Sequence, residues 1–344
     1  MNFKQLLRSD LPIIQAPMAG VQDSALALAV SSAGGLGSLP CGMLSPEKVQ
    51  AELTKIKAQT DRPINLNFFC HAPPKPDPAA EERWRKLLEP YYTEFGIDPD
   101  NIPQKASRQP FSHEMADVLE SFKPRIVSFH YGLPEKKLLD RVKGWGATVL
   151  STATTVAEAE WLEANGADGI IAQGSEAGGH RGMFLKKDVT TQIGTFALLP
   201  QIVQKVTLPV IAAGGIADAK GVRAILNLGA TAAQTGTAYL LCDEATTRDV
   251  HRVALKSDMI RHTVLTTLFS GGAARGMVNR VIRELGPMPA DVPPYPLASA
   301  ALAPLRAAAE AAGSGDFSPL WAGQNGTGCK EVSAAELTRE LAAD

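Results

Sequence analysis

Short apolar runs alternate with helix-like patterns along the first 241 residues of the chain. Most of these runs are continuously apolar, as in strands that are covered on both faces of a parallel sheet. The predicted strands are Ile13–Ala16, Leu36–Leu39, Ile64–Phe69, Ile126–Phe129, Thr148–Ser151, Gly169–Ala172, Val210–Ala213 and Ala232–Thr235. The predicted helices between them include Ala25–Ala33, Pro46–Ala58, Ala157–Asn165 and Ala219–Leu228.

Eight strand–helix units in series predict an α/β fold of the (β/α)8, or TIM-barrel, type over residues 1–242. A doubly wound sheet is the rival architecture. Its diagnostic turn is missing, because the first strand leads into APMAG (16–20) rather than into GxGxxG. The 344 residues are enough for a barrel of about 250 residues together with an appendage.

Two segments depart from the strand–helix rhythm. A long insertion after strand three, about residues 71–123, starts with the proline-rich run APPKPDPAA and then becomes helical, with several aromatic residues. Loops of such length are usually functional or disordered. The rhythm stops again after Cys242. Residues 243–310 have helical patterns, so we expect 243–344 to form a mostly helical C-terminal extension that closes the barrel and covers its mouth.

The amino-acid composition argues against several classes of binding partner. The net charge of −2 and the lack of a long basic run argue against binding to nucleic acid or to an anionic membrane. No stretch approaches 18 uninterrupted apolar residues, so no membrane span is expected. Four scattered cysteines predict reduced thiols, and we expect a cytoplasmic protein. No metal-ligand spacing is found, and the pattern leaves the oligomeric state open.

Glycine turns follow the last two predicted barrel strands. In this fold the active site lies at the carboxyl ends of the strands, and the loops after strands seven and eight commonly bind a phosphate through backbone N–H groups. Gly214 and Gly215 occupy the first of these loops, and Gln234, Thr235, Gly236 and Thr237 form the second. We therefore predict one phosphate-binding site here. Tight packing of strand against helix is the alternative explanation for the glycines.

Neutral groups at other strand ends suit a flat heteroaromatic ring. Asn67 and Gln173 each offer a hydrogen-bond donor and an acceptor, although ordinary bonding to backbone is the alternative. Further candidate contacts are the backbone and apolar face of Ala16, Pro17 and Met18 and the bare backbone of Gly178 and Gly179. One phosphate with one planar ring indicates FMN as the cofactor.

His180 is the predicted catalytic residue. It ends the glycine-rich turn GSEAGGH (174–180), and imidazole is the side chain whose ordinary pKa lies near neutrality. A structural histidine bonded to backbone is the alternative. Ser128 and His130, at the end of strand four, are candidates for the substrate pocket. His71 and His251 have no comparable context, so surface or core roles are expected for them. Arg275 is either an anion-binding group or a solvated loop residue.

Together these motifs resemble the nitronate monooxygenases, formerly called 2-nitropropane dioxygenases. The resemblance covers most of the chain and rests on PIIQAPMAG (12–20), GGLGSL (34–39), NFF (67–69), AQGSEAGGHRG (172–182), LPVIAAGGI (208–216), GATAAQTGT (229–237) and LWAGQ (320–324). It implies a TIM barrel with non-covalent FMN, with His180 as the catalytic residue. The implied FMN contacts are Asn67, Gln173, Gly178, Gly215 and Gln234–Thr237. The family usually has methionine where this chain has Thr235.

The reaction implied by the resemblance is oxidation of an alkyl nitronate, with propionate 3-nitronate as a candidate substrate, by O2 to a carbonyl compound and nitrite. A protonated or N–H-donating His180 would hold the nitro oxygens, whereas a neutral His180 would remove a proton from the α-carbon of a nitroalkane, and the sequence leaves the choice between these states open. Two alternatives remain. One is an FMN-dependent NAD(P)H oxidoreductase, such as a quinone or enoyl-thioester reductase, and the other is a non-catalytic barrel that binds a phosphorylated metabolite.

Overall fold

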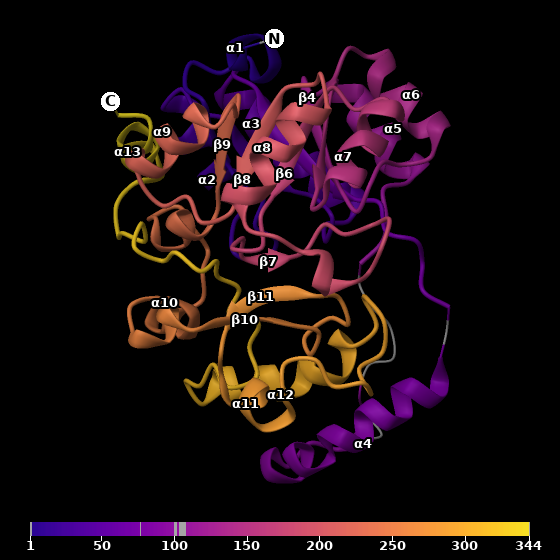
Figure 1. The fold of residues 1–344 in the computed structure, drawn as a ribbon. Coiled ribbons are helices and arrows are strands. Elements are labelled where there is room, and N and C mark those ends of the chain that lie inside the picture. Colours follow the sequence, from indigo (N-terminus) through magenta and orange to yellow (C-terminus); the bar gives the residue numbers. More distant parts are fainter. Residues whose placement is uncertain (1, 76, 100–101, 103–107, 344) are drawn as a thin grey trace.

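The chain forms a TIM barrel, which confirms the predicted fold class (Figure 1). The structure is a computed structural model that describes residues 2–75, 77–99, 102 and 108–343. Eight parallel strands pair in the order β1-β9-β8-β6-β5-β4-β3-β2, and a bridge between Ile14 and Leu36 brings the two ends of the sheet together. The strands are β1 Ile13–Gln15, β2 Gly37–Pro40, β3 Ile64–Phe69, β4 Ile126–His130, β5 Thr148–Ala153, β6 Gly169–Gln173, β8 Val210–Ala213 and β9 Ala232–Thr235.

Helices surround this sheet, and several start at side-chain caps that satisfy free N–H groups of the first turn. Asp23 and Thr155 cap α2 and α7, while Ser45 followed by Pro46 begins α3. The helices of the barrel are α2 Ser24–Ser32, α3 Pro46–Gln59, α5 His113–Phe122, α6 Lys136–Gly144, α7 Val156–Ala164, α8 Thr195–Lys205 and α9 Ala219–Asn227. α13 (Ala334–Leu341) returns to pack on α2.

The barrel interior changes character along its axis. Near the amino ends of the strands it is apolar, and α1 (Phe3–Leu7) closes this end with Leu6 and Leu7, which pack on Ile14 and Leu150. Full burial of each such side chain stabilises the fold by about 1.5–3 kcal/mol. Toward the carboxyl ends the interior becomes polar, with buried Gln15, Ser38, Asn65, Asn67 and Gln173. A polar floor at this end is where a TIM barrel places its chemistry.

The predicted insertion divides between two parts of the molecule. Its last helix, α5, packs against α3 and α6 and is an ordinary barrel helix. Its long helix α4 (Pro78–Phe95) instead packs on α12 (Ser299–Ala311) of the C-terminal extension, away from the barrel (Figure 1). Trp84 Nε1 donates to the carbonyl of Ala298, and the Tyr92 hydroxyl donates to that of Ala301. The insertion and the extension therefore share one hydrophobic core.

A small antiparallel sheet connects this second core to the barrel. The extension was expected to be helical, and it does contain α10 (Asp249–Leu255) and α11 (Arg280–Leu285), but β10 (Thr263–Thr266) and β11 (Ala274–Met277) lie between them. β11 also pairs with the two-residue strand β7 (Gly179–His180), so that Ala274 lies opposite His180. The strands are short, and β7 pairs with β11 across a long sequence separation, which explains why local periodicity did not predict them. None of the helices in the described ranges is long and apolar enough to cross a membrane.

Candidate active site

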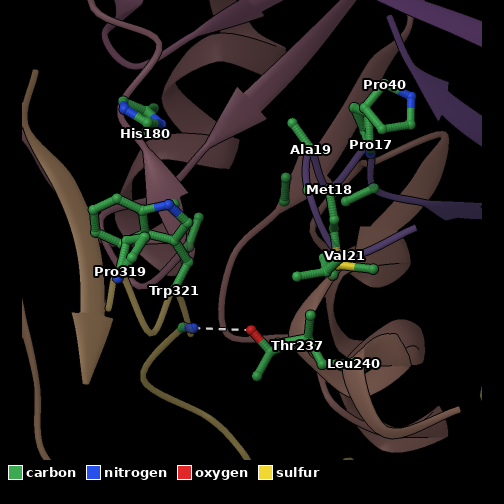
Figure 2. Close-up of a pocket in the computed structure, with 18 of the residues that line it drawn as sticks. Pro17, Met18, Ala19, Val21, Pro40, His180, Thr237, Leu240, Pro319 and Trp321 are labelled. Carbon is green, nitrogen blue, oxygen red and sulfur yellow. Dashed lines mark hydrogen bonds between the residues drawn. The ribbon is translucent and has the colours of Figure 1, made fainter. Parts of the chain in front are cut away.

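A cavity opens at the carboxyl ends of the barrel strands and extends under the C-terminal extension (Figure 2). Its walls come from the barrel on one side, with Met18, Val21 and Leu240, and from the extension on the other, with Pro319 and Trp321. Of the predicted site residues, those that line this cavity are Ala16, Pro17, Met18, Asn67, His130, Gln173, Gly178, Gly179, His180, Gly214, Gly215, Gln234, Thr235, Gly236 and Thr237.

Ser128 is the exception among the predicted pocket residues. It is fully buried behind the cavity wall and does not line the cavity. Its hydroxyl instead accepts a hydrogen bond of 3.0 Å from Asn67 Nδ2. Ser128 on β4 pairs in register with Asn67 on β3, so the two side chains lie on the same face of the sheet. Ser128 therefore orients Asn67 rather than contacting a ligand.

The two glycine turns form one end of the cavity. Gly215 has φ +75°, a conformation that disfavours side-chain-bearing residues, and Thr237 begins the 3-10 helix η3 (Thr237–Leu241). The first N–H groups of such a helix have no partner within it. The Thr237 hydroxyl oxygen accepts a 2.8 Å hydrogen bond from the N–H of Gly323, which fixes its direction (Figure 2). Bare backbone, a hydroxyl and free N–H groups together suit an anionic phosphate.

Two further observations support a bound group at this end. The Gln234 side-chain oxygen is buried without a hydrogen-bond partner in the described part of the chain, and Gln234 lines the cavity. A buried acceptor of this kind costs about 1–3 kcal/mol unless a ligand or water satisfies it. At Gly178 a β-carbon would lie 2.6 Å from the backbone nitrogen of Gly323, so only glycine permits this close approach of two cavity walls. The residues present therefore fit a phosphorylated planar cofactor.

Buried arginines hold the turn after β6 in place. Arg181 is 1% exposed and donates to the carbonyls of Gln173 and Gly174, each at 2.6 Å. Arg275 donates to the carbonyls of Ser175 and Thr263, so it fixes the turn and does not line the cavity. Burial lowers the pKa of Arg181 to about 10, which leaves it charged at neutral pH. No role for Arg181 was predicted from the sequence, although its place in AQGSEAGGHRG marks it as part of the motif.

His180 lies at the junction of the barrel and the extension. Its Nε2 is 2.8 Å from the hydroxyl of Ser270, and its ring meets Trp321 and Tyr295 edge-on, with centroids 5.5 and 5.4 Å away. Its carbonyl accepts hydrogen bonds from the side chains of Gln173 and His130. Both the backbone and the ring of His180 are thus held in position, as catalysis by a fixed group requires.

A group of aromatic and polar side chains, His71, Arg108, Tyr131 and Tyr295, adjoins His180 and is called the aromatic cluster below. Tyr295 meets His71 at 4.9 Å and Tyr131 at 5.3 Å between centroids, and the Arg108 guanidinium lies 5.5 Å from the Tyr295 centroid. Each member has a buried polar atom without a hydrogen-bond partner in the described ranges: His71 Nδ1, Arg108 Nη1 and both tyrosine hydroxyls. His71 itself is buried and does not line the cavity, which agrees with the surface or core role expected for it.

Backbone strain also marks the aromatic cluster. Tyr131 directly follows β4 and has φ +70°, in the left-handed region that costs a side-chain-bearing residue about 1–3 kcal/mol. Strain of this size persists where the surrounding structure enforces it, and it often occurs at ligand sites. Here it turns Tyr131 toward Tyr295.

The histidines around the cavity are held uncharged. Burial, followed by the nearby Arg108, His130 and His71, lowers the pKa of His180 well below its ordinary value. Burial likewise lowers the pKa of His130 and of His71 to about 4. At neutral pH each ring therefore has one N–H donor and one acceptor nitrogen. Of the two states left open by the sequence, the fully protonated imidazolium is the one that this environment disfavours.

A barrel with glycine turns and a partly buried histidine in one cavity at the carboxyl ends of its strands has the features of an α/β-barrel enzyme. A model of the nitronate monooxygenase family matches residues 2–344. The chain belongs to this family of oxidoreductases.

Individual relatives agree with this assignment. Over 345 aligned positions the chain is 43% identical to a nitronate monooxygenase of Pseudomonas aeruginosa, with 99% of this chain and 97% of that protein covered. It is also 43% identical to one of Paraburkholderia phytofirmans, with 98% and 92% covered. The solved structure of a nitroalkane oxidase from Streptomyces ansochromogenes matches with a TM-score of 0.89 at 38% identity, over 99% of this chain and 96% of that one.

Proposed function

We propose that this protein uses FMN and O2 to oxidise alkyl nitronates to a carbonyl compound and nitrite. The single observation that carries the proposal is the neutral, rigidly held His180 in a cavity that fits a phosphorylated planar cofactor. Atom balance requires that each nitronate gain one oxygen atom when its C–N bond breaks to give the carbonyl group and nitrite. When bound, FMN would supply the electron-transfer chemistry that links this step to O2.

The chain's own residues would hold FMN and the substrate. Gly214, Gly215, Gly236 and Thr237 would bind the phosphate, and the orphaned Gln234 oxygen would accept a hydrogen bond. Asn67, oriented by Ser128, and the backbone of Ala16, Pro17, Met18, Gly178 and Gly179 would face the ring. Both ends of the Gln173 amide already bond to backbone, so its main role would be to position the His180 turn.

Within the nitronate class we propose a substrate with a second anionic group, of which propionate 3-nitronate is the example. Arg108 lines the cavity beside His180, and its Nη1 is buried without a partner. Tyr131 and Tyr295 are buried next to Arg108 and interact with each other through their hydroxyl groups, which could turn to donate to the same anion. A carboxylate would satisfy all of these groups, and hydrogen bonds to a charged group contribute about 1.5–3 kcal/mol each.

The rival function is an NAD(P)H-dependent flavin oxidoreductase, and one experiment separates the two. The purified, FMN-loaded protein would be mixed without oxygen with propyl nitronate in one sample and with NADH or NADPH in another, while flavin absorbance is followed. We expect a rapid absorbance change with the nitronate and release of nitrite when air is admitted. Rapid bleaching by NAD(P)H with no response to nitronate would overturn the proposal, and a colourless protein that cannot be loaded with FMN would favour simple metabolite binding.

We also propose a reducing compartment, the cytoplasm, as the place of action. All four cysteines, Cys41, Cys70, Cys242 and Cys329, are free thiols in the structure. Free thiols are typical of proteins that fold in a reducing environment.

A further inference from the structure

The ring of His180 has a single hydrogen-bond partner in the described part of the chain. Its Nε2 lies 2.8 Å from Ser270 Oγ, while Nδ1 has no protein partner and His180 lines the cavity. Ser270 is 1% exposed and lies in the loop between β10 and β11, in the C-terminal extension. The extension thus reaches the predicted catalytic residue through one hydroxyl group.

The surroundings of Ser270 decide which way its proton points. Its oxygen accepts a 3.3 Å hydrogen bond from the N–H of Gly272, and the two acceptors within its reach are His180 Nε2 at 2.8 Å and the Gly272 carbonyl at 3.4 Å. The 2.8 Å contact with Nε2 fits donation in either direction, but if the ring donated, the Ser270 proton would be left only the long, weak contact with the Gly272 carbonyl at 3.4 Å. If Ser270 donates to Nε2, the Gly272 N–H donates to Ser270 and Ser270 donates to His180. Hydrogen bonds in such a chain polarise and strengthen one another.

We infer that Ser270 is a positioning residue that selects the Nδ1–H tautomer of His180, so that a neutral imidazole presents an N–H donor to the cavity. A neutral imidazole that accepts at Nε2 must carry its proton at Nδ1. The catalytic consequence of this tautomer rests on the proposed function. A nitronate is an anion, and its oxygens would accept a hydrogen bond from the Nδ1–H group.

The tautomer also determines which form of the substrate is used. With Nδ1 protonated and the Nε2 lone pair taken up by the Ser270 hydroxyl, His180 has no free lone pair and cannot remove the α-proton of a neutral nitroalkane. It can instead stabilise the negative charge of a nitronate that is already ionised. The arrangement therefore favours the nitronate over the corresponding nitroalkane, a choice that the sequence left open.

The test reads the tautomer directly and requires no substrate. The FMN-loaded protein would be labelled with ring-15N histidine, and the His180 ring nitrogens would be assigned by their loss in His180→Asn. We expect the proton on Nδ1 in the wild type. In Ser270→Ala we expect a shift toward the Nε2–H tautomer, which free imidazole side chains prefer, whereas Ser270→Thr keeps the hydroxyl and should keep the wild-type tautomer. A proton on Nε2 in the wild type would overturn the inference.

Kinetics of the same variants test the consequence. Ser270→Ala should lower kcat/KM for propyl nitronate by about tenfold, the loss expected for one well-placed hydrogen bond, and should raise the activity on neutral nitropropane relative to the nitronate. Ser270→Thr should recover most of the nitronate activity. An unchanged ratio of the two activities in Ser270→Ala would contradict the assigned role. If no variant oxidises nitronate, the proposed function fails, while the tautomer measurement still stands.

Discussion

The side chain of Gln173 bridges the turn that carries His180. Its Nε2 donates to the His180 carbonyl at 2.9 Å, and its Oε1 accepts from the N–H of Gly182 at 2.9 Å. One amide at the end of β6 thus holds the backbone on both sides of Arg181. Its donor and acceptor groups, which suggested a ring contact in the sequence, are used mainly to place the predicted catalytic residue.

Replacement of Gln173 should separate this structural role from cofactor binding. In Gln173→Leu the Gly182 N–H and one lone pair of the His180 carbonyl lose their partners, so we expect a loss of about 1–3 kcal/mol in stability, measured by thermal unfolding. Gln173→Glu keeps the acceptor for Gly182 but places a buried carboxylate oxygen against the His180 carbonyl, so it should be destabilised as well. Equal stability of Gln173→Leu and the wild type would show that the bridge does not hold the turn.

His180→Asn should retain FMN and lose most nitronate turnover. Asparagine preserves a polar side chain of smaller size, but it cannot replace the fixed imidazole donor, so we expect a fall in kcat of about 100-fold or more. The measurement is oxygen uptake with propyl nitronate, with flavin absorbance as the check on FMN content. His113→Asn changes an exposed histidine that pairs with Glu135 and should be neutral. Full activity of His180→Asn would remove His180 from the mechanism.

Gly215→Ala should weaken FMN binding beyond its effect on stability. An alanine held in the left-handed backbone conformation of Gly215 would lower the stability by about 1–2 kcal/mol. If the backbone relaxed to relieve this strain, the predicted phosphate site would be distorted. Gly96 is the matched control, because it has φ +63° with open space around it at the end of α4. Both variants should lower the melting temperature, but only Gly215→Ala should release FMN on dialysis. Equal FMN retention in the two variants would show that Gly215 does not bind the phosphate of FMN.

Arg108→Met should change selectivity among nitronates. Loss of the guanidinium removes the partner proposed for the substrate carboxylate, so kcat/KM for propionate 3-nitronate should fall by about 10- to 100-fold, the effect of one charge-assisted hydrogen bond. Propyl nitronate has the same chain length without the carboxylate and should be used almost as well as before. Arg83→Met removes an exposed cation paired with Asp291 and controls for net charge. The same loss with both substrates would argue against a carboxylate site.

Stability should decrease as the solution is acidified below about pH 6.5. His71, His130 and His251 have folded-state pKa values of about 4, below the unfolded value near 6.5, because burial disfavours their charged forms. Between these two pKa values the unfolded chain binds protons that the folded chain does not. The contribution of each neutral histidine to the free energy of unfolding is therefore fully present above pH 6.5 and falls by up to about 3 kcal/mol toward pH 4.

His251→Gln tests this linkage away from the predicted catalytic residue. The variant removes one of these titrations, so its melting temperature should fall less steeply with acidification than that of the wild type. The slopes would be compared between pH 8 and pH 4 on FMN-loaded protein. Parallel curves for the two proteins would show that His251 is not held uncharged in the folded state.

The sequence by itself determined the barrel and the glycine turns, because each depends on local signals. Apolar runs of strand length, helix caps and the glycines of the β8 and β9 turns were all readable within short windows, and the strand boundaries agree within one or two residues. His180 was also identified, since strand, glycine turn and histidine are consecutive.

Only the tertiary structure decided what surrounds His180. Tyr295 and Ser270 come from the extension and Arg108 from the insertion, at sequence separations that no periodicity spans. The pairing of β7 with β11 brings these segments to the barrel mouth, and burial there sets the charge state of the histidines. The same holds for Ser128, because the pairing register of β3 and β4 places its hydroxyl against Asn67, which it supports instead of lining the cavity.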